Sequence, residues 1–118
     1  MDNFIKISED FSETPGGRLA SQGSFSGEEF RDDVLLPKLQ LAIMSNSKLT
    51  IDLDGGCGYA SSFLDEVFGG LIRNHGFRLE DIKDKLIFIS NEEQRYIEEI
   101  NSCLEDAECD GWIARHTY

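Results

Sequence analysis

The residues from Lys48 to Asn74 constrain the fold more than any other stretch of this 118-residue chain. They begin with Leu49-Thr50-Ile51-Asp52-Leu53, a short β-favouring run that predicts a buried strand. The glycine-rich segment 54–58 follows, and glycines permit backbone angles that other residues avoid. After Ser61 and Ser62, apolar residues recur at spacings of three and four, which predicts an amphipathic helix. A strand, a glycine loop and a helix in this order indicate a site at the carboxyl end of a sheet.

The composition bounds the class of protein. With 40% hydrophobic residues, the chain suits a single domain over residues 1–118 with one core. A net charge of −12 disfavours nucleic acid and anionic membranes as partners, because both are bound through Lys and Arg, and favours a basic protein. The start lacks a signal-peptide pattern and no apolar run is of membrane-spanning length, so we expect a cytoplasmic protein. Three cysteines predict free thiols, and with two histidines we expect no metal site and no cofactor.

The first 24 residues are predicted to contribute strands. Phe4-Ile5-Lys6-Ile7 alternates apolar and polar residues, as a half-buried strand does. Thr14-Pro15-Gly16-Gly17 indicates a turn. Arg18-Leu19-Ala20-Ser21 can begin a second strand, which would make residues 4–24 a hairpin.

The first helix is predicted from a capping-box spacing. Ser26 and Glu29 are three residues apart, so that each side chain can bind a free backbone N–H of the other at a helix start. Pro37 lies inside the helix that follows, and it lacks an N–H. We therefore expect a kink there, or two short helices, ending by Asn46.

The remaining elements complete an alternating pattern. Gly76 is predicted to end the central helix in the left-handed conformation, and Leu79-Glu80-Asp81-Ile82 to form a single helical turn. Leu86-Ile87-Phe88-Ile89 predicts a strand covered on both faces. The order β(β)αβαβα favours parallel pairing through right-handed crossovers. We therefore predict an α/β sandwich, with a mostly parallel or mixed four-stranded sheet covered by helices.

The last helix is predicted to be acidic on one face. Ser90 and Glu93 repeat the capping-box spacing before it. Its acidic residues are Glu92, Glu93, Glu98, Glu99, Glu105 and Asp106. Residues 110–118 are predicted to be a short tail in which Trp112 and Ile113 fold back onto the core.

Three motifs between Arg18 and Asn91 resemble a bacterial STAS-like domain family of undetermined function. They are Phe25-Ser26-Gly27-Glu28-Glu29-Phe30, the strand end Ile51-Asp52-Leu53-Asp54-Gly55, and Ser61-Ser62-Phe63-Leu64-Asp65-Glu66 followed by Phe68-Gly69. The resemblance implies a STAS-like fold. Through the related STAS domains of anti-sigma-factor antagonists, it also implies a non-enzymatic regulatory protein whose partner is a serine kinase or an ATPase-type anti-sigma factor.

The classical STAS domains carry an Asp-Ser-Ser-Gly-Leu motif between a strand and a helix, and a kinase phosphorylates its first serine. By this resemblance Ser61 falls on the phosphoacceptor, Ser62 on its neighbour and Leu64 on the leucine. The chain departs from the motif at Ala60, in place of aspartate, and at Phe63, in place of glycine. Ser61 and Ser62 are thus the candidate phosphoacceptors.

The same two serines have a simpler interpretation. A serine at a helix N-terminus is well placed to carry phosphate, because free N–H groups and the helix dipole stabilise negative charge. Capping alone also explains a serine there, with Ser62 and Asp65 as a second capping box. We favour capping and keep the phosphorylation switch as the alternative.

The glycine loop also carries groups that could support an enzyme. Asp52 and Asp54 flank a strand end and could bind magnesium, although an Asp54-Gly55 pair is also typical of a turn. Cys57 lies between glycines, as in a nucleophile elbow, but it would need a base. His75 is expected at the far end of the next helix, which leaves only His116.

The leading interpretation is a regulatory domain that binds a protein partner. Its predicted contact surface comprises Asp54, Gly55, Gly56, Cys57, Gly58, Tyr59 and Asp65. The first alternative is an acidic inhibitor or immunity-type protein that binds a basic enzyme through its last helix. The less favoured alternative is a small enzyme that uses Cys57 or the Asp52/Asp54 pair. Arg18 and Arg73 are predicted to be solvated surface charges.

Overall fold

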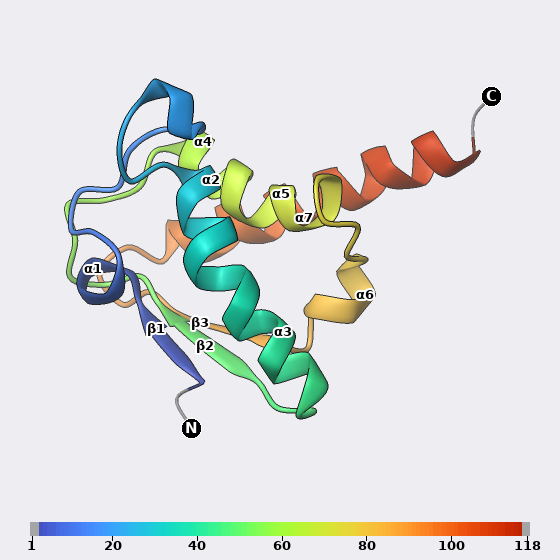
Figure 1. Ribbon diagram of the computed structural model, residues 1–118, viewed down its shortest axis with the longest axis horizontal. Coiled ribbons are helices and arrows are strands. Elements are labelled where there is room, and N and C mark those ends of the chain that lie inside the picture. The colour runs from blue at the N-terminus through green and yellow to red at the C-terminus, as the bar shows by residue number, and fades with distance from the viewer. Residues whose placement is uncertain (1–2, 117–118) are drawn as a thin grey trace.

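The structure is a computed structural model that describes residues 3–116. Its sheet contains three strands in the order β1 (Phe4–Lys6), β2 (Leu49–Asp52) and β3 (Leu86–Ile89). Both pairs are parallel, with Ile5 opposite Ile51 and Ile51 opposite Phe88 (Figure 1). The α/β class and parallel pairing are confirmed, whereas the predicted fourth strand is absent from the described residues.

Residues 18–21 do not form the second strand that the sequence predicted. Helix α1 (Ile7–Asp10) follows β1 directly, and a short 3₁₀ turn, η1 (Ala20–Gln22), occupies the predicted strand. The N–H of Gly27 donates to the carbonyl of Gly17 (2.8 Å), so this segment bonds to the start of the next helix instead of to β1. The predicted hairpin over residues 4–24 is therefore wrong.

Two continuous helices and one long terminal helix make up the helical layer. The first runs through α2 (Gly27–Glu29), the π-helical turn η2 (Phe30–Leu35) and α3 (Leu36–Met44). The second runs through α4 (Ser61–Leu64), the π-helical turn η3 (Asp65–Gly69) and α5 (Gly70–Arg73). The predicted single helical turn, α6 (Leu79–Ile82), precedes β3, and α7 (Arg95–His116) follows it. No helix within residues 3–116 is long and apolar enough to cross a membrane.

The first helix starts where the sequence predicted, and it is irregular near Pro37. The Ser26 hydroxyl accepts the N–H of Glu29 (3.1 Å), which confirms the cap, although the Glu29 carboxylate binds the N–H of Phe25 instead of that of Ser26. The π-helical turn ends at Leu35, two residues before Pro37. The N–H of the intervening Leu36 donates to the carbonyl of Arg31, five residues back. The expected irregularity near Pro37 is thus a widened turn inside a continuous helix.

In the second half of the chain, the predicted helix end at Gly76 is confirmed, whereas the predicted cap at Ser90 is not. Gly76 has a φ of 75°, the left-handed conformation predicted for a residue that ends a helix. The Ser90 hydroxyl instead donates to the carbonyl of Glu93 (2.6 Å), and α7 begins only at Arg95. Ser90 is therefore part of a turn before α7, so the predicted capping box is wrong.

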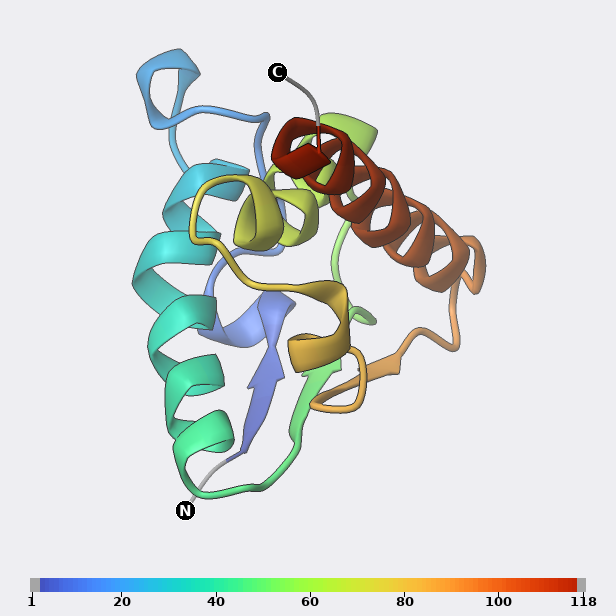
Figure 2. The same cartoon turned by 90° about the vertical axis from the view of Figure 1, so that its right-hand side faces the viewer.

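The helices cover only one face of the sheet. The side chains that point toward them are Ile5, Leu49, Ile51, Leu53, Leu86 and Phe88. The side chains of the opposite face are Phe4, Lys6, Thr50, Asp52, Ile87 and Ile89, all half-buried or exposed. Ile87 is 44% exposed, so the prediction that its strand is covered on both faces is wrong. In Figures 1 and 2 the long helices lie together on one side of the strands.

The core lies between the sheet and the helices. The predicted apolar stripe of the second helix is buried throughout: Phe63, Leu64, Val67, Phe68, Leu71 and Ile72. Helix α7 adds Ile100, Leu104 and Ala107.

The end of α7 projects beyond this core (Figure 1). Trp112 is 53% exposed and Ile113 49% exposed, so neither folds back as predicted. Residues 110–116 continue α7 instead of forming a tail, because helical hydrogen bonding extends past the last buried residue. Residues 1–2 and 117–118 of the predicted N-terminal and tail segments lie outside the described residues.

Candidate functional site

The loop after β2 begins at the carboxyl end of the sheet and is bonded to the segment that follows β3. The Asp54 carboxylate accepts the N–H groups of Asn91 (3.1 Å) and Glu92 (2.9 Å). Gly55, at a φ of 95°, donates its N–H to the Glu92 carboxylate (2.6 Å). These bonds, with the Glu92 N–H contributing most, lower the pKa of Asp54. The predicted turn at Asp54-Gly55 is confirmed.

The rest of the loop is held by two further segments. The N–H of Cys57 donates to the Glu13 carbonyl (2.8 Å), which belongs to the connection after α1. Tyr59 donates its hydroxyl to the Leu53 carbonyl (2.9 Å) and its N–H to the Tyr96 hydroxyl (3.3 Å) of α7. Burial raises the pKa of Tyr59. Backbone and side-chain hydrogen bonds therefore tie the loop to the connection after α1, to the segment after β3 and to α7.

The two aspartates at the strand end are engaged in bonds that support the loop. Asp52 accepts the N–H of Asp54 (2.9 Å) and lies 3.8 Å from the Lys6 ammonium group. The carboxylate of Asp54 is already occupied by two backbone donors. Within residues 3–116, no group of three or more His, Cys, Asp or Glu residues is arranged to hold a metal ion.

Cys57 is exposed, and the structure places both histidines elsewhere. His75 contacts the carboxylate of Asp32 (2.8 Å), and His116 contacts the carbonyl of Trp112 (2.8 Å) near the projecting end of α7. Cys57, Cys103 and Cys109 are free thiols, as predicted. Burial raises the pKa of the Cys103 thiol to about 11, which disfavours its reactive thiolate form.

The candidate phosphoacceptors occupy the first two positions of α4. Ala60 is the N-cap residue, and no side chain caps this helix. The favoured interpretation of Ser62 and Asp65 as a capping box is therefore wrong, because the helix begins one residue before Ser62. Ser61 is exposed and Ser62 is half-buried. The structure thus leaves Ser61 as an accessible hydroxyl with no capping role.

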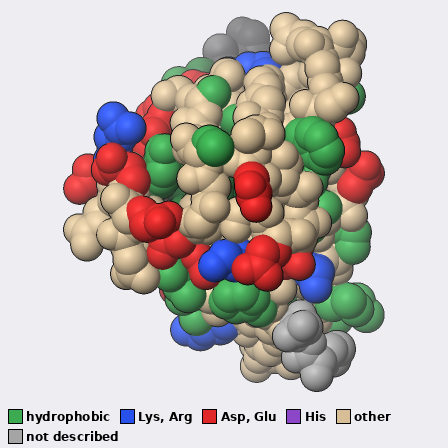
Figure 3. Space-filling model, turned by 90° about the vertical axis from the view of Figure 1, so that its left-hand side faces the viewer, with side chains coloured by type: hydrophobic (Ala, Val, Ile, Leu, Met, Phe, Trp, Pro, Cys, Tyr) green, Lys and Arg blue, Asp and Glu red, His purple; other side chains and the backbone are tan. Residues whose placement is uncertain are grey.

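A shallow depression of about 480 Å³ surrounds Ser61. Its other lining residues are Tyr59, Arg95, Glu98, Glu99 and Ser102. Arg95 is the one cation of this lining and lies 4.0 Å from the Glu93 carboxylate. Figure 3 shows acidic side chains over the side of the molecule that carries α1 and the glycine loop, with basic side chains interspersed among them. The lining of the depression carries Glu98 and Glu99 against Arg95, so a partner of the depression would meet net negative charge.

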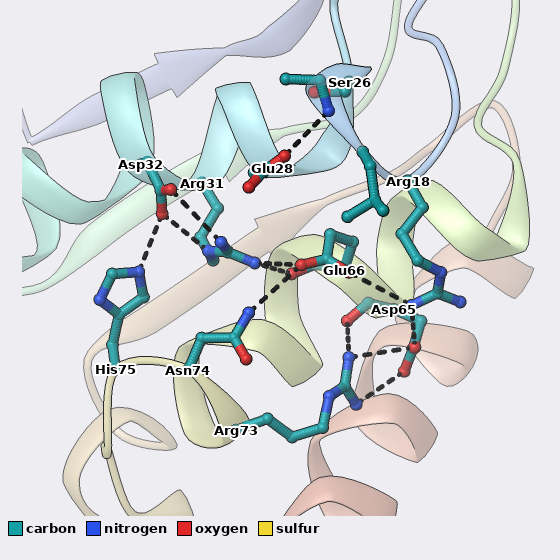
Figure 4. Close-up of polar contacts among 12 residues, drawn as sticks. Arg18, Ser26, Glu28, Arg31, Asp32, Asp65, Glu66, Arg73, Asn74 and His75 are labelled. Carbon is teal, nitrogen blue, oxygen red and sulfur yellow. Dashed lines mark hydrogen bonds and ion pairs between the residues drawn. The ribbon is translucent and has the colours of Figure 1, made fainter. Parts of the chain in front are cut away.

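Asp65, one turn after Ser61, is the centre of an ion-pair cluster (Figure 4). Its carboxylate lies 2.7 Å from Arg18 and 3.1 Å from Arg73. Burial would raise the pKa of Asp65, but the hydrogen bonds from the two arginines outweigh it and lower the pKa. Arg73 is exposed and Arg18 half-buried, so both lie at the surface, but the sequence did not predict that both pair with Asp65. A partner that contacts Asp65 would therefore also meet these two arginines.

A buried ion pair beside this cluster was missed at the sequence level. Arg31 is 3% exposed and Glu66 is 6% exposed, and the guanidinium also donates to the Glu66 carbonyl (2.9 Å). A Cβ atom on Gly70 would overlap the guanidinium. The Gly69-Gly70 pair was the available signal. Glycine inside a helix lowers the stability of the helix, so its presence there indicates that another group packs where a side chain would otherwise lie.

The structure defines a small α/β domain with a parallel sheet, helices on one face and an accessible serine at the start of the helix that follows the glycine loop. Residues 26–95 match the family described as the STAS-like domain of unknown function, and the chain belongs to this family. This match confirms the resemblance found in the sequence. Comparisons with curated proteins and with solved structures found no match.

Proposed function

We propose that this STAS-like protein is a non-enzymatic regulatory domain that binds a protein partner through the glycine loop, residues 54–60, and the start of α4. Phosphorylation of Ser61 would switch this binding. The observation that carries the proposal is the exposed Ser61 hydroxyl, which does not cap its helix and lies beside a loop fixed by bonds to three other segments.

The chemistry of the depression indicates how such a switch would act. A phosphate carries a charge of roughly −1.5 to −2 at neutral pH. On Ser61 it would be stabilised by the free N–H groups of the first helical turn and by Arg95, and repelled by Glu98 and Glu99. The modification would therefore change the charge of the contact surface and leave the fold intact. The partner suggested by STAS relatives is a serine kinase or an ATPase-type anti-sigma factor.

Affinity purification from the native cell, followed by intact-mass and phosphosite analysis, tests this proposal. We expect a kinase-like ATPase to be recovered, with phosphate on Ser61. Ser61→Ala should retain the partner constitutively and Ser61→Asp should lose it. Ser102→Asp is the matched control, because Ser102 lines the same depression from α7 and its change adds the same charge. Equal behaviour of the two Asp variants would contradict a switch at Ser61.

A second candidate function is the acidic inhibitor of a basic enzyme. The observation that favours it is the projecting end of α7, where Asp106 and Asp110 are exposed and belong to no ion pair within residues 3–116. Recovery of a basic enzyme and an unmodified chain would support this function. The double change Asp106→Lys with Asp110→Lys should then abolish inhibition, whereas it should not affect binding of a kinase at Ser61.

A further inference from the structure

β3 is an edge strand. On the edge that faces away from β2, its backbone groups make no hydrogen bond within residues 3–116. The N–H groups of Leu49 and Leu53 donate to the carbonyls of Lys85 (2.7 Å) and Ile89 (2.8 Å). Since successive residues of a strand direct their backbone groups to opposite edges, the N–H and C=O groups of residues 86 and 88 point away from β2. Within residues 3–116 no loop or side chain bonds to the backbone of these two residues.

A groove runs along this free edge, between β3 and α7. It consists of a hollow of about 550 Å³ near the carboxyl end of β3 and one of about 280 Å³ near α6, which share Phe88. The apolar residues that line them are Leu79, Ile82, Leu86, Phe88, Ile89, Ile97 and Leu104. Figure 2 shows β3 at the margin of the sheet with α7 above it.

The α7 wall of the groove is acidic. Glu98, Asn101 and Glu105 line it at intervals of three and four residues, and Gln94 lies just before the helix. Glu98 and Glu105 are exposed and take part in no ion pair within residues 3–116, and Lys83 is the single cation among the lining residues. From Glu98 to Glu105 the wall is roughly 10 Å long, the length of about three residues of extended chain. This length is within that of β3, which has four residues.

We propose that the free edge of β3 takes an extended, basic segment of a partner protein as an added strand. The backbone of that segment would bond to residues 86 and 88. Its Lys or Arg side chains would cover Phe88 and Ile97 with their aliphatic stems and bring their charges to Glu98 and Glu105. Its alternate side chains would lie beside Ile87, on the open face of the sheet.

A second copy of this chain fits the edge less well. Two-fold pairing of β3 with itself would bring the acidic walls of two chains into one interface. Each chain also carries a net charge of −12, so this contact would be repulsive. Charge complementarity therefore selects a basic partner segment. This surface is distinct from Ser61, although Glu98 borders both.

The probe for this proposal is a capped peptide of alternating Lys and Val, about nine residues long, so that it can span the groove. One control peptide has Glu in place of Lys, and another is the Lys–Val peptide N-methylated on alternate residues, which removes its hydrogen-bond donors along one edge. We expect the Lys–Val peptide alone to bind to the full chain. The amides of Leu86 and Phe88 should then exchange at least about tenfold more slowly by NMR.

A matched pair of variants separates strand addition from general attraction of cations. Glu105 lines the groove, whereas its neighbour Asp106 is exposed but does not line it. Glu105→Lys should weaken peptide binding by about tenfold, and Asp106→Lys by less than about threefold. Ser61 lies outside the groove, so Ser61→Asp should not change the slowed exchange of the Phe88 amide in the peptide complex. This test is therefore independent of the Ser61 switch.

Three outcomes would overturn the proposal. The first is peptide binding without protection of the Leu86 and Phe88 amides. The second is equal weakening by Glu105→Lys and Asp106→Lys. The third is a dimer by light scattering in which those amides are already protected without peptide, since a second copy would then occupy the edge.

Discussion

The guanidinium of Arg31 lies 2.5 Å from the carboxylate of Glu66, and both side chains are buried in the contact between the two continuous helices. Asn74 adds a third polar contact by donating to the same carboxylate (3.3 Å). This pair joins η2 to η3 through a bond across 35 positions of sequence. Because η3 continues from α4, the pair also helps to set where Ser61 is presented.

Removal of one partner of this pair should be costly. Arg31→Met would leave the buried Glu66 carboxylate with only the partly exposed Arg18, 3.4 Å away, as a counter-charge. We expect a loss of about 3 kcal/mol in the free energy of unfolding. The double change Arg31→Met with Glu66→Met should recover most of the loss. Urea denaturation of the single and the double variant measures their free energies of unfolding. Arg78→Met is the control, because Arg78 pairs with Glu108 at a 43% exposed position and should cost less than about 1 kcal/mol. Equal costs for the two arginines would contradict this account.

Gly70 and Gly111 should respond oppositely to the same substitution. A Cβ atom on Gly70 would overlap the Arg31 guanidinium, so Gly70→Ala should destabilise the protein by about 2 kcal/mol despite alanine's helix propensity. A Cβ atom on Gly111 would meet only the end of the Arg115 side chain at 3.2 Å. Gly111→Ala should therefore stabilise α7 by up to about 1 kcal/mol. Thermal unfolding of the two variants measures the difference, and a stabilising Gly70→Ala would show that Arg31 can move aside freely.

The serines at the two helix starts should differ in their contribution to stability. Ser26 is buried and caps α2, so Ser26→Ala should cost about 1 kcal/mol. Neither Ser61 nor Ser62 caps α4, so replacing either with alanine should change the free energy of unfolding by no more than about 0.5 kcal/mol. Chemical denaturation of the three variants makes the comparison. A cost at Ser62 as large as that at Ser26 would restore the capping interpretation.

Acid should remove the contribution of Asp65 to stability. Burial raises its pKa, but the hydrogen bonds from Arg18 and Arg73 outweigh burial, so the folded-state pKa lies below the ordinary value of 3.8. A lowered pKa stabilises the folded state at pH above 3.8, and this stabilisation is lost as the pH falls through the folded-state value. The difference in urea midpoint between the wild type and Asp65→Asn should therefore be largest near neutral pH and shrink in acid. Asp84→Asn, at an exposed position, is the control. A difference that grows in acid would contradict this assignment.

Local patterns in the sequence predicted the elements that depend on neighbouring residues. The alternation in β1, the Ser26 cap, the apolar stripe from Phe63 to Ile72 and the stop at Gly76 are all confirmed. Each is determined within a few positions of the chain, by side-chain periodicity or by the conformational freedom of one residue. The three motifs that carry the family resemblance belong to the same local level.

Some predictions failed because the partner of a residue lies in another element of the chain. Residues 18–21 are not part of the sheet, because the backbone carbonyls of Gly17 and Arg18 accept the N–H groups of Gly27 and Glu28 at the start of α2. Arg18 and Arg73 lie at the surface as predicted, but their common ion pairing with Asp65 was not predicted. Sequence spacing cannot rank such alternatives, because the free energy of an ion pair depends on how deeply the fold buries it.

The sequence by itself determined an acidic α/β domain with parallel strands, a glycine loop and a serine pair at the start of a helix. Only the tertiary structure decided that the serines do not cap, that Arg31 and Glu66 pair inside the protein, and that β3 keeps an open edge beside an acidic helix. The physical reason is the same in each case. Periodicity records which way a side chain faces along its own element, whereas partners, burial and free edges arise when elements distant in the chain pack together.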